Sequence, residues 1–465
     1  MLPRLRPGIK PTMIDLKTNT HSLIENFELM KGLLATYGPE SLHMLRERGF
    51  RSYSEFGIPT TKDEEFKYLS LRALEEGEFK PAYGATLDRY QLEKTVIGHI
   101  DAITVAFVNG EHAPELSTDH ILPEGCFVGS IKDGLVLHEE IIVKHIGQIA
   151  TLRNKLGSSN DERFVHLNTA FLGEGAFVYL PKGVSLSRPI HLLFLSNADH
   201  GALASHPRSL IVLEENSDTK ILETYLGLEG MCFTNAVTEV HVGPNAILEH
   251  TKVQLEQADT IHIANTSVNQ AEHSIYTSNN ISLGAKIARN DVNVYLDGER
   301  TETWLNGASV GLGEQVIDNH TRIDHAKPNC NSFEVYKAIL GGNSTGVFNG
   351  KIFVYEDAQK TDAKQTNQAL LLSRTASINT KPQLEIFADD VKCTHGATVG
   401  QLREEAVFYL QSRGIPKREA EALLVFAFAA EVLQKVTIPG VRETLEKLLF
   451  ERLAENQDLP ELIED

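Results

Sequence analysis

Short apolar runs separated by turn residues at a regular spacing dominate the middle of the chain, between residues 161 and 400. The turn positions recur about every 14 residues, or at multiples of that spacing, as expected for half-coils of a stacked repeat. They are Gly175, Pro189, Ser217, Gly230, Gly243, Gly284, Gly298, Gly313, Gly342 and Asp357. One coil cannot bury its apolar face without a stacked neighbour, so the pattern favours a parallel β-helix with coils of about 28 residues. A β-sandwich is the alternative, with hairpin turns about every 8–12 residues.

Helical patterns precede this region. Residues 21–48 carry apolar positions close to the helical period, with an interruption at Gly38-Pro39. Thr61 stands three residues before Glu64, the spacing of a capping box, and this predicts a helix start.

Helical patterns also follow the predicted β-helix region. Gly414 lies where a helix would end, and Pro416 lies where a first-turn proline is tolerated. The predicted C-terminal helices are 401–413, 417–436 and 441–456. The apolar residues of 417–436 cover more than one helix face, which suggests a docking surface as well as a packing face. We therefore expect three parts: residues 1–160, mostly helical with a short strand at 102–108; a β-helix core, 161–400; and a C-terminal helical domain, 401–465.

The charge balance limits the partners. The chain has 63 acidic residues against 44 lysines and arginines, a formal net charge of −19. A nucleic-acid-binding protein needs a basic footprint, and anionic lipid attracts basic segments, so we expect neither nucleic acid nor membrane as a partner.

The cysteines and the hydropathy indicate a reducing compartment. Cys126, Cys232, Cys330 and Cys393 are far apart and form no C-x-x-C pair, so we expect no disulfide framework. The first residues contain no apolar signal core, and no run of about 18 apolar residues exists. The predicted location is the cytoplasm.

The sequence contains no Walker A pattern and no H-E-x-x-H pattern. The glycine-rich stretch 341–346 lacks the lysine of a phosphate loop and is interpreted as a coil corner. Several single histidines are interpreted as hydrogen-bonding along a β-helix face, in preference to metal ligation. They are His191, His206, His241, His250, His262, His273, His320 and His325.

One pair of residues suggests metal chemistry. Cys393 and His395 are two residues apart at the end of a strand-like run, and residues i and i+2 of a strand point to the same face. A thiol and an imidazole on one face can supply part of the ligand set of iron or a cluster, though not all of it. The alternative is a buried structural thiol with a capping histidine. Cys330 is interpreted as structural.

The segment that holds this pair resembles the C-terminal signature of the SufB/SufD family, more specifically its SufD subunits, the scaffolds of the SUF iron–sulfur cluster assembly machinery. The matching segments are 381–400, 408–415, 427–431, 63–68 and 348–352. The resemblance implies a mainly β fold with helical ends, a right-handed parallel β-helix core flanked by N-terminal and C-terminal helical regions. It also implies a non-catalytic scaffold that pairs with a SufB-like subunit and binds a SufC-like ATPase through its C-terminal helices.

The same resemblance assigns roles to the pair. In the family, the histidine that matches His395 faces a cysteine of SufB across the β-helix interface, and this pair is implicated in the assembly of a nascent iron–sulfur cluster, so the resemblance implies iron or such a cluster at the interface. Cys393 matches the family too, with a less defined role. A flavin in the complex and a homodimer of the isolated chain are further implications without a site in the sequence. SufB-like chains carry a glutamate-rich stretch where this chain has 395–400, which favours the SufD type.

The competing hypothesis is a carbohydrate-active enzyme, because many β-helices cleave polysaccharides with carboxylates along a groove. The single tryptophan, Trp304, offers little surface for stacking sugars.

Overall fold

A computed structural model describes residues 21–82, 87, 100–118, 120–151, 162–198 and 201–454. The parts of the predicted helical regions at 1–20 and 455–465 lie outside this range. Within it, no helix combines the length and the apolar character needed to cross a bilayer.

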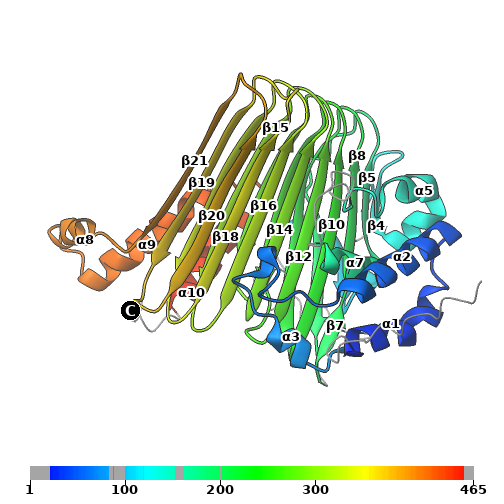
Figure 1. Cartoon of the computed structure of the whole chain (residues 1–465), viewed down its shortest axis with the longest axis horizontal. Helices are drawn as coiled ribbons and strands as arrows, with labels where there is room; N and C mark the ends of the chain where they lie inside the picture. Colours follow the sequence, from blue (N-terminus) through cyan, green and yellow to red (C-terminus); the bar gives the residue numbers. More distant parts are fainter. Residues whose placement is uncertain are drawn as a thin grey trace, which may run out of the picture.

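Two stacked sheets form a β-solenoid that occupies the middle of the molecule, and helices precede and follow it along the chain (Figure 1). Sheet A has the order β20-β18-β16-β14-β12-β10-β8-β5-β4, and β1 and β7 join it at the side. Its strands are β1 (Lys80–Pro81), β4 (Phe127–Ser130), β5 (Gly175–Leu180), β7 (Leu203–Ser205), β8 (Arg208–Leu213), β10 (Cys232–Val242), β12 (Ile261–Gln270), β14 (Ile287–Leu296), β16 (Val316–His325), β18 (Thr345–Val354) and β20 (Ser377–Ile386).

Sheet B has the order β21-β19-β17-β15-β13-β11-β9-β6-β2-β3. Its strands are β2 (Ile103–Val108), β3 (Glu111–His112), β6 (Ile190–Asn197), β9 (Asp218–Glu229), β11 (Ile247–Leu255), β13 (Ile275–Ser282), β15 (Glu302–Gly311), β17 (Asn331–Leu340), β19 (Asp362–Leu371) and β21 (Lys392–Gly400). From β8 onward the chain visits the two sheets in turn, and the paired strands are parallel. The predicted parallel β-helix is therefore confirmed, and the sandwich alternative is wrong.

Coil length follows from the register of the paired strands. Ile261 pairs with Ile287, and Ile287 pairs with Val316, so successive coils begin at these positions and differ slightly in length. Near the C-terminal end the coils are longer, since Thr345 pairs with Ser377. The predicted coil of about 28 residues is therefore close to the observed lengths.

The coil corners contain a backbone conformation that the sequence pattern did not reveal. One non-glycine residue per coil adopts the left-handed conformation at a corner, which L-residues seldom do. These residues are Asn216, Asn245, His273, Arg300, Asn329 and Lys360. Gly298 is needed instead for close approach, because a Cβ there would collide with the backbone of the preceding coil at Glu272. Gly175, expected in a turn, lies in β5, where a Cβ would collide with the Arg208 carbonyl.

The helices of the N-terminal region are α1 (His21–Leu34), α2 (Glu40–Phe56), η1 (Glu64–Phe66), α3 (Arg72–Glu76), η2 (Pro114–Leu116), α5 (Ile131–His145) and α7 (Arg163–Ala170). They cover the first coils of the solenoid, except for η1, which lies over the outer face of sheet A. The predicted break between the first two helices is confirmed, with Gly38 at φ 80°. The predicted capping box of Thr61 and Glu64 is wrong. The turn is held instead by Asp63, whose carboxylate accepts the Thr60 backbone N–H at 2.7 Å and pairs with Arg163.

Two elements lie on the unexpected side of the predicted limit at residue 160. Strand β2 pairs in parallel with β6, so sheet B already includes a segment from the N-terminal region. All six residues of β2 are buried, as expected for a strand covered on both faces. Helix α7 falls on the other side of the limit, at the start of the region predicted to be β-helix.

The C-terminal helices are α8 (Glu404–Gln411), α9 (Lys417–Leu433) and α10 (Val441–Ala454). Helices α9 and α10 run back along the outer face of sheet B, where one apolar cluster joins them to its strands. Val425, Ala429 and Leu445 are buried in that cluster. Much of the apolar excess on 417–436 is therefore used in packing within the chain.

Candidate functional site

The C-terminal end of the solenoid is uncovered. Strands β20 and β21 are the last in their sheets, and each pairs with a described strand along one edge alone. Their inward-facing residues continue the buried rows of the preceding coil but remain partly or fully exposed. These residues are Ile378, Thr380, Pro382, Leu384 and Ile386 of β20, and Cys393, His395, Ala397 and Val399 of β21. We refer to this surface as the open end.

Cys393 and His395 face the interior of the last coil. Cys393 lies in register with Ala363, and His395 lies in register with Gln365, and both of these partners are buried. The two side chains therefore point to one face, as expected from their spacing. Cys393 is half-buried against apolar neighbours, and this burial raises the pKa of its thiol. His395 is exposed.

A buried acid lies two coils before His395. Glu334, in β17, is in register with Gln365, so Glu334, Gln365 and His395 form one row across β17, β19 and β21. The Glu334 carboxylate accepts hydrogen bonds from the Thr321 hydroxyl at 2.6 Å and from the Gln365 amide at 2.9 Å. Burial raises the pKa of Glu334 to about 7, although both hydrogen bonds oppose that rise. Sequence reasoning missed Glu334 and Gln365. The signal that could have found them is their spacing from His395: Gln365 lies one coil length before it, and Glu334 lies two.

Histidines deeper in the solenoid belong to a buried polar network. His250 Nε2 lies 2.8 Å from the Glu223 carboxylate, and His262 Nδ1 lies 2.7 Å from that of Glu256. Lys252 Nζ contacts His262 Nε2 at 2.8 Å, and burial lowers the pKa of this lysine to about 8. Hydrogen bonding inside the solenoid is therefore confirmed for His250 and His262. Throughout the described ranges, no three side chains of the His, Cys, Asp or Glu type converge as a metal site would require.

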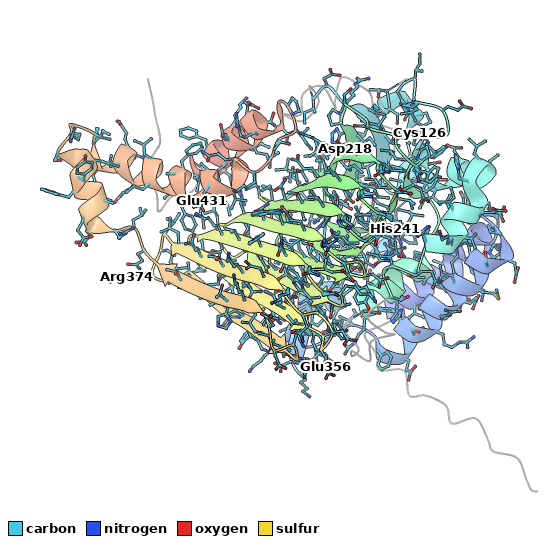
Figure 2. All side chains as sticks on the ribbon, turned by 90° about the horizontal axis from the view of Figure 1, so that it is seen from above. Cys126, Asp218, His241, Glu356, Arg374 and Glu431 are labelled. Carbon is cyan, nitrogen blue, oxygen red and sulfur yellow. The ribbon has the colours of Figure 1, made fainter. Side chains whose placement is uncertain are left out.

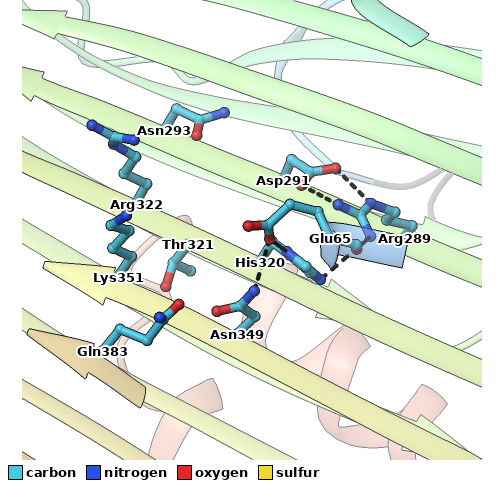
Figure 3. Close-up of a pocket in the computed structure, with 10 residues that line it drawn as sticks. All are labelled: Glu65, Arg289, Asp291, Asn293, His320, Thr321, Arg322, Asn349, Lys351 and Gln383. Atoms are coloured by element: carbon cyan, nitrogen blue, oxygen red, sulfur yellow. Dashed lines mark hydrogen bonds and ion pairs between the residues drawn. The ribbon is translucent and has the colours of Figure 1, made fainter. Parts of the chain in front are cut away.

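His320 lies on the outer face of sheet A, in a hollow that Figure 3 shows in close-up. Its ring contacts Asp318 at 2.8 Å and Glu65 of η1 at 3.2 Å, while Arg289 pairs with both Asp291 and Asp318. Burial and the nearby Arg289 lower the pKa of His320, but Asp318 and Glu65 outweigh them and raise it to about 9. A protonated His320 thus fastens the N-terminal segment to the sheet.

Two other sequence features have structural roles. Cys330 is buried, and its thiol donates to the Gly298 carbonyl at 3.2 Å, which agrees with its interpretation as structural. The predicted coil corner is found at residues 341–344, with Gly342 at φ 64° and the Asn343 N–H donating to the Gly313 carbonyl, and residues 345 and 346 begin β18. All four cysteines have free thiols.

A second surface lies beside the open end. Helix α8 extends beyond the last coils, and a groove separates it from the corner at Arg374, which Figure 2 labels at this end of the solenoid. Phe408 of α8 lines this groove and is exposed by more than half of its surface, as are Tyr409 of the same helix and Leu423 of α9.

Together these features define a class of protein: a parallel β-solenoid capped by helices at one end and open to strand pairing at the other. The family model "SUF system FeS cluster assembly, SufBD core domain" matches residues 194–428, and "SufBD protein N-terminal region" matches residues 17–192. The chain belongs to the SufBD family of iron–sulfur cluster assembly proteins.

Individual relatives agree with this assignment. A SufBD family iron–sulfur cluster assembly protein of Synechocystis sp. is 34% identical, over 83% of this chain and 86% of the relative. SufD of Escherichia coli is 30% identical, over 85% of this chain and 90% of the relative. SufD of Bacillus subtilis is 29% identical, over 68% of this chain and 73% of the relative. Within the family the chain is therefore SufD-like.

Proposed function

We propose that this chain is a non-catalytic scaffold subunit of a SUF complex, in which its open end pairs with a SufB-like subunit. The observation that carries the proposal is that the last strand of each sheet has an unpaired edge at the open end. Strands β20 and β21 have 10 and 9 residues, and their outer backbone edges are unpaired within the described part of the chain. Long exposed edges invite further strands, and natural proteins cover or blunt them. A partner that adds one strand to each sheet would satisfy both edges and bury the apolar side chains between them.

Iron or a nascent cluster would be held at this junction as cargo. His395 and Cys393 give this chain at most one imidazole and one thiol on the face that the partner covers. Iron in a cluster takes four ligands, so the partner and the cluster sulfides would supply the rest. His395 is the better candidate because it is exposed, whereas Cys393 is half-buried and the pKa of its thiol is raised by burial. We assign no site to a flavin.

The SufC-like ATPase would bind at the groove beside α8. Phe408, which lines the groove, and Tyr409, on the same helix, are exposed aromatic anchors, and aromatic residues are enriched at protein interfaces. Deleting the C-terminal helices is a poor test of this assignment, since α9 and α10 also cover the apolar outer face of sheet B. Point substitutions at the exposed anchors are preferable.

The family is an assembly family, so the alternative of a carbohydrate-active enzyme gains no support from the relatives. Trp304 is also poorly placed for sugar stacking, because its ring stacks on Phe333 at 4.4 Å between centroids.

Co-purification tests the proposal. The chain carrying an affinity tag would be recovered anaerobically from its own cells, and bound proteins, iron and acid-labile sulfide would be measured. We expect a SufB-like subunit, an ATPase, and both inorganic components in the same complex. Recovery of the chain without partners would contradict the proposal.

A further inference from the structure

Only one of the two polar atoms of the Gln365 amide has a hydrogen-bond partner in the described part of the chain. Its Nε2 donates to the Glu334 carboxylate at 2.9 Å, which fixes the orientation of the amide. Its Oε1 is buried and has no hydrogen-bond partner in the described part of the chain. An unmade hydrogen bond at a buried acceptor costs about 1–3 kcal/mol, so a partner that binds at this oxygen would be favoured.

The register of the stacked strands indicates that partner. Gln365 and His395 are register neighbours in β19 and β21, where adjacent parallel strands are about 4.8 Å apart. Both side chains face the interior, and Gln365 is 1% exposed while His395 is exposed at the open end. Across the core, Gly350 leaves the space that the amide occupies, because a Cβ at that position would collide with Gln365 Nε2.

We propose that Glu334 and Gln365 are positioning residues for His395. When the open end is covered and His395 binds iron, one ring N–H of His395 donates to Gln365 Oε1, which leaves the other ring nitrogen as the ligand. Glu334 acts through Gln365, because its carboxylate accepts from Nε2 and so turns the acceptor of the amide toward the histidine. Metal-bound histidines almost always have such an acceptor on the second nitrogen, which fixes the tautomer and the ring orientation. The inference rests on the proposed function of His395.

The test uses the co-expressed complex, freed of cluster, and Co²⁺ as the probe. Gln365→Leu removes the acceptor with little change in volume, and we expect Co²⁺ affinity to fall by about 10–100-fold, the usual effect of losing such a partner. The double variant Glu334→Gln with Gln365→Glu exchanges the two groups and keeps one amide–carboxylate hydrogen bond. It again presents an oxygen to His395, so we expect it to restore most of the affinity. A residue needed only for packing would show no such rescue.

His395→Ala separates the inference from the function on which it rests. If His395→Ala loses Co²⁺ binding while Gln365→Leu keeps wild-type affinity, the inference is wrong and the proposed function survives. If His395→Ala keeps wild-type affinity, the proposed role of the histidine is wrong, and the inference with it. Should Gln365→Leu fail to fold, Glu334→Gln serves in its place, because an amide at 334 no longer fixes the orientation of Gln365. Unchanged affinity in that folded variant would likewise overturn the inference.

Discussion

His395 lies directly beyond Gln365 in the stacked strands β21 and β19, and the Gln365 amide is itself held by the buried Glu334. The exposed candidate ligand His395 is thus the next residue in a row of stacked side chains whose earlier members, Glu334 and Gln365, are buried and hydrogen-bonded to each other. A side chain at the end of a loop would lack this support. Here the parallel register places the support one coil length away for every inward-facing residue of the last strand.

The open end predicts the oligomeric state of the isolated chain. Without a SufB-like partner, we expect β20 and β21 of two copies to pair, because the same apolar rows are exposed on both. Val399→Lys places a charge among these rows and should yield a monomer, since charged residues block edge pairing. Light scattering coupled to size exclusion measures the result.

Phe408→Lys is the matched control, because Phe408 is also an exposed apolar residue but lies on α8, in the lining of the proposed ATPase groove. It should leave the dimer intact and reduce the amount of ATPase retained by the complex. A dimer that persists in Val399→Lys would contradict the assignment of the open end as the pairing surface.

The contact of η1 with sheet A predicts a dependence of stability on pH. The folded pKa of His320 is about 9, above the usual value of 6.5, so its contribution is fully present below pH 6.5 and is lost as the pH rises through 9. A shift of this size corresponds to at most about 3 kcal/mol. We expect the free energy of unfolding, measured in urea between pH 6 and pH 10, to fall across this window.

His320→Gln is the control for that measurement. It should be less stable than the wild type at pH 6, and its stability should change less between pH 6.5 and pH 9. The same slope in both proteins would show that another group is responsible.

A buried ion pair predicts where the N-terminal helices are anchored. Arg208 and Glu239 are both fully buried, and Glu239 also accepts backbone N–H groups of Gly147, Ile149 and Ala150, just after α5. Arg208→Met would leave the carboxylate without its cation, and breaking such a buried pair costs about 3–5 kcal/mol. Urea unfolding measures this loss.

Lys182→Met provides the comparison, because Lys182 pairs with Glu215 at the exposed surface. Pairs of that kind contribute about 1 kcal/mol or less. Equal losses in the two variants would refute the anchoring role of Arg208.

Much of the fold could be predicted from periodicity. The recurring turns identified the solenoid and its coil length, because every coil has to reverse direction at the same place. The left-handed corners at Asn216 and His273 were missed, since many residue types can adopt that conformation when the stacked coils enforce it. The capping box failed for a related reason, because Asp63 competes for the same turn and is held by the distant Arg163.

The candidate site could be predicted only in part. The spacing of Cys393 and His395 was sufficient to place both on one face. The support from Glu334 and Gln365 depends on which residues of successive coils are in register, and coils of unequal length obscure that register in a single sequence. The apolar excess on α9 was visible, but its main use, packing on sheet B, depends on where the helix returns along the solenoid.

In the function proposed here, His395 helps to hold iron or a nascent cluster at the junction with a SufB-like subunit. The most direct test is the iron and acid-labile sulfide content of the complex purified with His395→Ala. His395 is exposed in the single chain, so its truncation should change the stability of the chain by no more than about 0.5 kcal/mol. The backbone edges of β20 and β21 remain available to the partner, so the complex should elute normally on size exclusion. We predict an intact complex with little iron and sulfide, and a milder loss in Cys393→Ser. Wild-type iron and sulfide in an intact His395→Ala complex would contradict the account.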